Sequence, residues 1–234
     1  IYLRTGTMLA SADEFSIEVE GLGAHAAFPH QGVDSVYVAS QIVVALQSIV
    51  ARNTDPLDSV VVTVGKISAG STSNVIPQTA ELLGTVRALT EDTRKETLSL
   101  IKRVVEHTAS AYGAKAKLFI HKDGYPPTVN DPRARSVVEH VVNEVLGKSI
   151  DAVELDRPIM GAEDFAFMLK KRPGCYFFLG NGVFEKQDPL KKPQATSCSL
   201  HNSNYDFNDR LIKIGAEFWV NLVYERLGAK ITDG

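Results

Sequence analysis

Four short segments in the first half of the chain have the residue pattern of β-strands. In the first, Phe15, Ile17 and Val19 alternate with polar residues, as in a strand with one buried face. The segment 59–67 consists largely of β-branched residues, which predicts a strand buried on both faces or nearly so. Two further alternating segments, at 80–88 and 116–120, complete the set.

Two amphipathic helices are predicted between these strands. Over 34–52, apolar residues recur every three or four positions, which is the spacing of one helix face. The second helix is expected to begin after Thr90, a good N-cap residue, and to end at Gly113, a common C-terminal stop. The resulting order, β-α-β-β-α-β, predicts a ferredoxin-like α+β domain over residues 13–122.

The second half of the chain has the pattern of an incomplete α/β unit. Glycine and prolines between 123 and 132 mark a boundary. Only two strands are predicted beyond it, at 150–155 and 175–179. Three helices are expected, at 132–146, 163–171 and 207–227. Two strands make a poor sheet on their own. The rest of this sheet is therefore expected to be missing or to lie upstream of Ile1.

Composition and charge exclude several classes of protein. The 234 residues are 44% hydrophobic and 23% charged, which is typical of a globular chain and not of a disordered one. The net charge is 25 − 28 = −3, so nucleic acid is not an expected partner. The sequence shows no apolar run near the length of a membrane span, so no membrane association is expected. Cys175 and Cys198 do not form a disulfide framework, which favours a reducing, cytoplasmic location.

Two polar loops in the first half contain candidate functional residues. GLGAHAAFPH at 21–30 places His25 and His30 between a strand and a helix, where they can reach a ligand or simply form a turn and helix entrance. The loop STSNVIP at 71–77 contains Asn74 and is followed by Arg87 on an otherwise apolar strand. Such a guanidinium needs an anionic partner, either Glu81 on the same face or the carboxylate of a substrate.

Two further segments in the second half contain potential metal ligands. GAEDF at 161–165 places Glu163 and Asp164 at a helix start, where capping explains one of the two carboxylates and an active-site rim explains both. LHNSNYDFND at 200–209 contains His201, a plausible metal ligand, with Cys198 as a weak second candidate. Asp206 or Asn208 in the same segment is more simply a helix cap.

Together with GTMLASADEF at 6–15, these motifs resemble the aminoacylase/carboxypeptidase superfamily of dinuclear metallohydrolases. The similarity is to the branch of hippurate hydrolase and the indole-acetyl-amino-acid amidohydrolases. It implies a zinc-peptidase-like α/β catalytic domain interrupted by a ferredoxin-like lid that also forms a homodimer. Residues 1–12 resemble the end of the N-terminal catalytic segment, 13–122 resemble the lid, and 123–234 resemble the returning half of the catalytic domain. The expected substrate is a small N-acyl amino acid, hydrolysed with two divalent metal ions per site (Zn, Mn, Co or Ni).

The resemblance also implies a role for each matching residue. His201 resembles the metal ligand of the C-terminal half, and His25 resembles the lid histidine that reaches the site of the neighbouring subunit and stabilises the oxyanion. Asn74 and Arg87 resemble the residues that bind the free carboxylate of the substrate. Glu163 and Asp164 are expected to line the metal pocket.

The Cys-Gly-His-Asp-Gly-His stretch and the adjacent Glu-Glu pair of the family are absent. They supply most of the metal ligands and the general base. We therefore interpret the chain as the C-terminal part of such an enzyme, inactive by itself and unable to hold a catalytic metal tightly. A cleaved N-terminal catalytic segment is a possible partner. The alternative is a non-enzymatic module that dimerises or binds small carboxylates.

Overall fold

The computed structural model describes residues 1–147, 150–181, 201–205 and 207–228, which fall into two compact units. The sheet unit comprises Thr7–Val129 and Arg157–Arg172, and the terminal unit comprises the described residues of Ile1–Gly6, Asn130–Asp156 and Pro173–Gly234. Where the chain enters and leaves the sheet unit, strand β2 (Gly6–Leu9) pairs with strand β9 (Thr128–Asn130).

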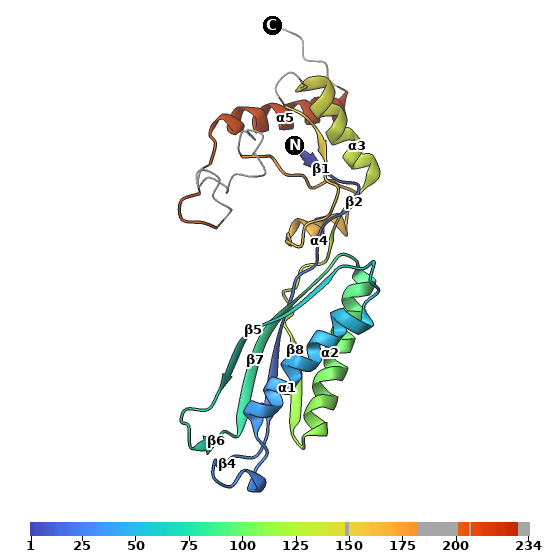
Figure 1. Ribbon diagram of the computed structural model, residues 1–234. Coiled ribbons are helices and arrows are strands. Elements are labelled where there is room, and N and C mark those ends of the chain that lie inside the picture. The colour runs from blue at the N-terminus through green and yellow to red at the C-terminus, as the bar shows by residue number, and fades with distance from the viewer. Residues whose placement is uncertain (148–149, 182–200, 206, 229–234) are drawn as a thin grey trace, which may run out of the picture. The chain divides into compact units, whose positions relative to one another are not determined.

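The sheet unit is built on one four-stranded antiparallel sheet (Figure 1). Its strands are β3 (Asp13–Glu20), β5 (Val60–Ala69), β7 (Thr79–Ala88) and β8 (Lys115–Ile120), in the spatial order β5-β7-β3-β8. Helices α1 (Ser35–Ser48) and α2 (Glu91–Ala111) connect β3 to β5 and β7 to β8. This chain order and this spatial order are those of a ferredoxin-like fold, as predicted.

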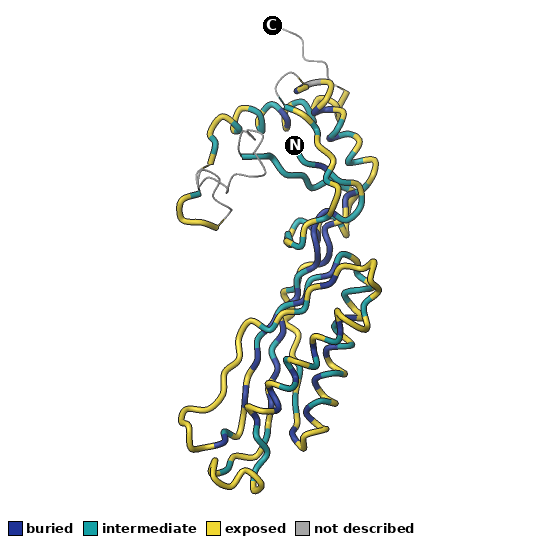
Figure 2. Tube along the Cα trace, viewed as in Figure 1, coloured by how far each residue is buried: buried dark blue, intermediate teal, exposed yellow. Residues whose placement is uncertain are grey.

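The core of the sheet unit lies between the two helices and one face of the sheet (Figure 2). The side chains that form it are fully buried and come from alternate strand positions and from the inner face of each helix; they include Phe15, Ile17, Leu82, Val86, Ile42, Leu46, Ile101 and Val105. Gly84 contributes by having no side chain, because a Cβ there would lie 2.2 Å from Cζ of Phe15. The ring of Phe15 therefore fills the space over Gly84.

Local hydrogen bonds set the helix ends where the sequence predicts them. The Asp34 carboxylate accepts from the backbone N–H groups of Val36 and Tyr37 at 2.9 and 3.1 Å, and so begins α1. The Thr90 hydroxyl accepts from the N–H of Thr93 at 3.1 Å and begins α2. Gly113, with φ of 77°, follows its end.

Helix α1 continues into a π-helical turn, η2 (Ile49–Asn53), and this changes one expectation. Together, Ser35–Asn53 is a 19-residue helix that is apolar enough to cross a membrane by length and composition alone, with a mean hydropathy of 1.3. No run of that length was expected. Its inner face, which includes Val38, Ile42, Leu46 and Ile49, packs in the core of the sheet unit. A core helix therefore accounts for the composition.

Strand β5 is more exposed than predicted. Val60 is buried, but Val61 and Ile67 are 37% and 51% exposed, so the expectation of burial on both faces is wrong. The reason is position, because β5 lies at the edge of the sheet and its outward face is uncovered by any helix of the described chain. A bulge between Val64 and Lys66 also shifts its register with β7.

A buried ion pair joins the start of β3 to the start of α2. The Asp13 side chain is 1% exposed and receives two hydrogen bonds from Arg94, at 2.6 and 2.7 Å. These bonds raise the pKa of Arg94. Gly124 closes over the pair, since a Cβ at this position would lie 2.5 Å from Oδ1 of Asp13. The Asp13 carboxylate therefore depends on Arg94 for compensation of its charge.

Replacing Arg94 with methionine should destabilise the sheet unit by about 3–5 kcal/mol, because it leaves the Asp13 carboxylate buried without a partner. Urea unfolding followed by circular dichroism measures the change. Arg103→Met provides the control, since Arg103 is exposed on the same helix. Equal small losses for both variants would show that Asp13 is adequately solvated without Arg94.

The terminal unit is held together by a small core and a few strand pairs. Strands β1 (Tyr2–Leu3) and β10 (Val153–Glu154) are parallel neighbours. Residues Leu3, Val138, Val141, Val142 and Phe218 are among those that form the core. The helices are α3 (Pro132–His140), the π-turn η3 (Val141–Val145) and α5 (Arg210–Leu227). Asp131 caps α3, as predicted, by accepting from the N–H groups of Arg133 and Ala134.

Two strand predictions in this unit need correction. The strand expected at 150–155 is limited to the two residues of β10, and the one expected at 175–179 is limited to one antiparallel bridge between Tyr2 and Phe178. The apolar side chains of the second segment pack against the core instead, and Phe177 contacts the Phe218 ring at 4.9 Å. Apolar composition is thus satisfied by packing alone, whereas a strand also needs a neighbouring strand.

Candidate functional site

A short strand pair in the sheet unit brings together two loops that are far apart in sequence. Strand β4 (Ala24–His25) pairs antiparallel with β6 (Val75–Ile76), and the N–H of Ala26 donates to the backbone oxygen of Asn74 at 3.0 Å. In this pairing His25 lies opposite Val75, and Asn74 lies opposite Ala26, so the structure brings the backbones of His25 and Asn74 to within one position of each other at the β4–β6 end of the sheet unit (Figure 1).

The environment of His25 fixes which of its nitrogens carries the proton. Its Nδ1 atom accepts a hydrogen bond from the backbone N–H of Ala27 at 3.1 Å. In the neutral imidazole the proton then resides on Nε2, which is left as a donor. The Phe28 ring lies 5.7 Å from that of His25 and 6.4 Å from that of His30. His25 is exposed, so its Nε2–H is available to a ligand.

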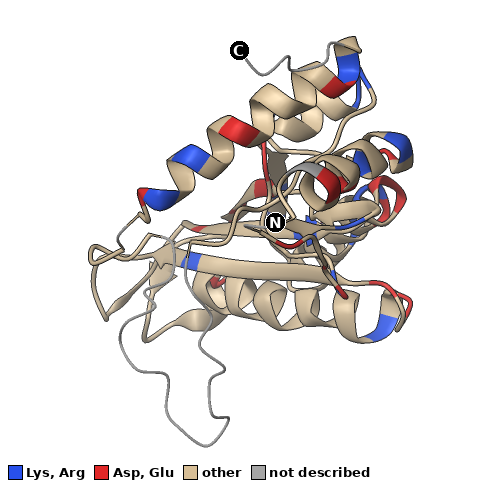
Figure 3. Ribbon diagram, turned by 90° about the horizontal axis from the view of Figure 1, so that it is seen from above, with Lys and Arg blue, Asp and Glu red and all other residues tan. Residues whose placement is uncertain are grey.

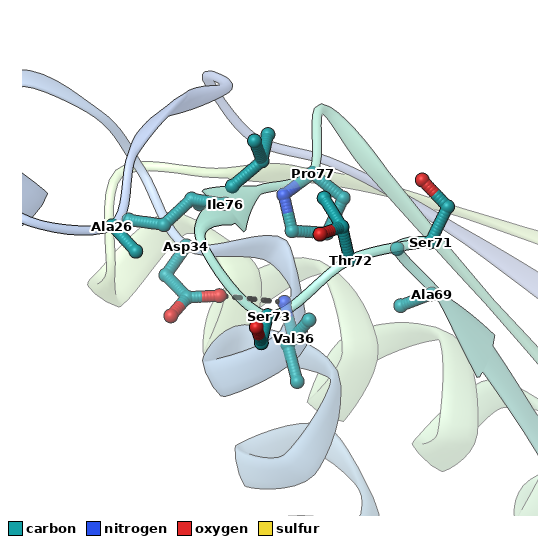
Figure 4. Close-up of a pocket in the computed structure, with 11 residues that line it drawn as sticks. Ala26, Asp34, Val36, Ala69, Ser71, Thr72, Ser73, Ile76 and Pro77 are labelled. Atoms are coloured by element: carbon teal, nitrogen blue, oxygen red, sulfur yellow. Dashed lines mark hydrogen bonds between the residues drawn. The ribbon is translucent and has the colours of Figure 1, made fainter.

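Beside this pair lies an open hollow of about 610 Å³ (Figure 4). Its wall includes the hydroxyl-bearing residues Ser71, Thr72 and Ser73, together with apolar atoms of Val36 and Pro77. The Asp34 carboxylate also lines it but is already used as the cap of α1. The hydroxyls and the loop backbone are therefore the polar groups that the hollow offers.

Arg87 lies on the face of the sheet that has no helices, near the end of β7 that is remote from the loop containing Asn74. Its neighbours Val86 and Ala88 face the core, so Arg87 projects from the face without helices, where it is half-buried beside Val61. Glu81, one of its two proposed partners, pairs instead with Lys66 at 3.6 Å. No carboxylate of the described residues lies within 4.0 Å of a nitrogen of Arg87. Within the described residues, the guanidinium therefore has no carboxylate partner.

Arg87 and the His25–Asn74 pair are held at opposite ends of β7. Ala69 pairs with Ala80, so the loop that contains Asn74 extends from the Thr79 end of the strand. From Thr79 to Arg87 is 87 − 79 = 8 residues, or about 26 Å of strand at ~3.3 Å per residue. One copy of the chain therefore does not place Asn74 and Arg87 on the same small carboxylate.

The GAEDF segment lies at the Arg87 end. The N–H of Ala10 donates to the Ile159 oxygen at 3.0 Å, and the N–H of the next residue, Ser11, donates to the Ala88 oxygen at 2.8 Å. The segment leads into the short helix α4 (Phe165–Leu169), where Asp164 is the N-cap residue but its side chain forms no capping bond. Glu163 accepts instead from the N–H of Asp164 at 3.1 Å. Capping by Asp164 is therefore not the explanation for these carboxylates.

His201 belongs to the terminal unit and has an unusual backbone. Its φ of 71° is the only positive value at a non-glycine residue in the described part of the chain. Such a conformation is uncommon outside glycine, although histidine adopts it more readily than most residues, and strained backbone tends to cluster at functional sites. The N-cap residue of α5 is Asp209, whose side chain forms no capping bond, and Asn208 only accepts from the N–H of Arg210 at 3.2 Å, so the structure does not place Asn208 at the cap position. Cys198 and Asp206 lie outside the described residues.

Comparisons with known proteins place these residues in a family. Residues 8–113 match the peptidase dimerisation domain of family M20. The chain is 37% identical over 227 residues to hippurate hydrolase of Campylobacter jejuni, covering 97% of this chain and 55% of that protein. It is 42% identical over 178 residues to N-acetyl-L-cysteine deacetylase of Bacillus subtilis, covering 76% of this chain and 42% of that protein.

The chain contains an M20 dimerisation domain and is similar to M20 hydrolases along almost its whole length. This confirms the superfamily and the branch that the motifs indicate. A crystal structure of a dinuclear metal-binding M20 peptidase from Bacillus subtilis has the same fold, with a TM-score of 0.71 and 24% identity over 93% of this chain and 50% of that one. The chain spans about half the length of the M20 relatives it matches.

The similarity to M20 peptidases points to divalent metal ions. The described residues of this chain, however, do not fit a two-metal centre by themselves. They contain no group of three or more His, Cys, Asp or Glu side chains placed to hold a metal ion. A catalytic metal needs at least three protein ligands. Burial raises the pKa of the Cys175 thiol to about 11, so this thiol is also not a ready thiolate ligand at neutral pH.

Acidic and basic residues are interspersed along the described helices of this M20 chain, as its net charge of −3 leads one to expect (Figure 3).

Proposed function

We propose that this chain is part of a metal-dependent amidohydrolase that cleaves small N-acyl amino acids. The observation that carries the proposal is the half-buried Arg87, which faces no carboxylate of the described chain. A guanidinium in this setting matches the free carboxylate of an amino acid, to which it can donate two parallel hydrogen bonds. Hippurate and N-acetyl-L-cysteine, named by the two relatives, both combine such a carboxylate with an amide bond.

The other residues divide the remaining tasks. The Nε2–H of His25 donates to the oxygen on which negative charge develops as the amide carbonyl is attacked. Asn74 lies beside it and donates to the same region of the substrate. Glu163 and Asp164 line the site from the Arg87 end, and His201 contributes one imidazole to the metal centre. The acyl group, the amino acid and the metal (Zn, Mn, Co or Ni) are open.

The distance between the two ends of β7 favours a homodimer with shared sites. Because Arg87 and the His25–Asn74 pair are separated by about 26 Å of strand, they serve two different sites. A two-fold dimer through the sheet unit brings the Arg87 end of one copy to the His25 end of its partner. The edge strand β5, whose outer backbone has no partner in the described chain, is available for that contact.

We also propose that the 234 residues are inactive alone. His201 is one ligand, and the remaining metal ligands and the general base come from a segment like the N-terminal half of the relatives, whether joined to this chain or docked on it. Purified chain that hydrolyses N-acyl amino acids with stoichiometric metal would refute this point. Carboxylate binding with no turnover, even with the relatives' N-terminal half supplied, would favour the non-enzymatic module.

Arg87→Ala tests the proposed substrate class. In the enzyme that comprises this chain, it should raise KM for N-acyl amino acids about 10–100-fold, since a hydrogen-bonded charge pair is lost. The same substrates with the carboxylate converted to an amide should be affected little. Arg103→Ala changes an exposed helix position and should leave KM unchanged for both kinds of substrate. Equal loss on both kinds of substrate would show that Arg87 is structural.

A further inference from the structure

The side chain of Asn74 is oriented by a neighbour in its own loop. The Thr72 hydroxyl donates to Oδ1 of Asn74 at 3.0 Å. The backbone of Asn74 is fixed separately, by the hydrogen bond from Ala26 to its carbonyl oxygen. The main chain and the carboxamide are thus held by two independent contacts. The flanking hydroxyls of Ser71 and Ser73 line the same hollow but form no such bond to Asn74 within the described structure.

This contact determines what the carboxamide can offer. An asparagine side chain has an acceptor end and a donor end, and either can face a ligand when the side chain rotates. With Oδ1 bonded to Thr72, the NH2 group is the end left for a ligand. A neutral histidine likewise has one nitrogen that donates and one that accepts. Because Nδ1 of His25 accepts from the N–H of Ala27, Nε2 is the nitrogen left to donate to a ligand.

Two adjacent residues that could donate or accept are therefore both set as donors. His25 lies in β4 and pairs with Val75 of β6, and Asn74 immediately precedes β6, where its carbonyl oxygen accepts from the N–H of Ala26. A donor N–H or NH2 group favours an anionic oxygen and disfavours a group that itself donates.

We propose that Thr72 is a positioning residue, which fixes the Asn74 carboxamide with its NH2 group toward the anionic oxygen of the substrate. The identity of that oxygen rests on the function proposed above, whereas the orientation of Asn74 does not. Thr72 itself touches no reacting atom. Its effect passes entirely through Asn74.

The orientation is tested on the 234-residue chain without any catalysis. The side-chain NH2 signal of Asn74 in 15N-labelled chain is assigned from its loss in Asn74→Asp, and its order parameter is measured by NMR relaxation. Thr72→Val, which keeps the shape but removes the donor, should lower that order parameter. Thr72→Ser should preserve it, and so should Ser73→Ala in the same loop. An unchanged order parameter in Thr72→Val overturns the proposal.

The functional consequence is tested in the enzyme that comprises this chain. Thr72→Val should raise KM for an N-acyl amino acid about 5-fold, the effect of one lost hydrogen bond, and Thr72→Ser should restore it. In an Asn74→Ala background, Thr72→Val should have no further effect, because a positioning residue has nothing left to position. Additive losses overturn the proposal. Absence of turnover in the unmodified enzyme refutes the proposed function instead, while the NMR measurement still decides the role of Thr72.

Discussion

Replacing His25 with alanine should lower kcat by about 10²–10³-fold in the enzyme that comprises this chain, the usual cost of losing one oxyanion donor. The Nε2–H of His25 is set as a donor by the hydrogen bond from Ala27 to Nδ1. It therefore meets a negative oxygen best, and that oxygen carries its charge only in the transition state. The measurement is steady-state kinetics on an N-acyl amino acid.

The pattern of the kinetic change distinguishes this role from simple binding. A donor used only in the transition state lowers kcat and kcat/KM equally, whereas a ground-state contact raises KM. His30→Ala is the matched control, since His30 borders the same Phe28 ring from the other side and has no assigned role. An unchanged kcat in His25→Ala removes His25 from the mechanism. The exposed position of His25 makes loss of folding a poor explanation for any defect.

The fold of the sheet unit could be predicted from sequence because its signals are local. Helix ends depend on capping side chains one to three residues away, as at Asp34, Thr90 and Asp131, and strand faces depend on alternation. The exposure of β5 could not be predicted in this way, because an apolar segment does not indicate whether a second strand or a helix covers it. The same limit applies to 175–179, where apolar residues pack without forming a strand.

The candidate residues could be selected by their chemistry, but their arrangement depends on long-range pairing. The proximity of His25 and Asn74 comes from two-residue strands, β4 and β6, which are too short to have a periodic pattern. The partner of Glu81 depends on strand pairing, because the register of β5 with β7 brings Lys66 to it, whereas Arg87 lies about 20 Å further along the same strand. The separation of Arg87 from Asn74 along β7 follows only from knowing that the intervening residues form one continuous strand.

That separation leads to the second large prediction, which concerns mixed dimers. His25→Ala and Arg87→Ala are each expected to be nearly inactive at low substrate concentration. If each site takes Arg87 from one copy and His25 from the partner, a dimer of one variant with the other contains one intact site and one site with both defects. Random mixing by co-expression should then restore about a quarter of the unmodified kcat/KM, because half of the dimers are mixed and each has one working site.

A second pair of variants makes this result specific to the geometry. His25→Ala and Asn74→Ala affect the same end of the sheet unit, so every site in their mixed dimers carries one of the two defects, and no recovery is expected. If Arg87 and His25 of one copy served the same site, the first pair would also fail to recover, and the inference from the length of β7 would be wrong. If only the first pair recovers activity, the two ends of β7 in one copy must belong to different active sites of the dimer.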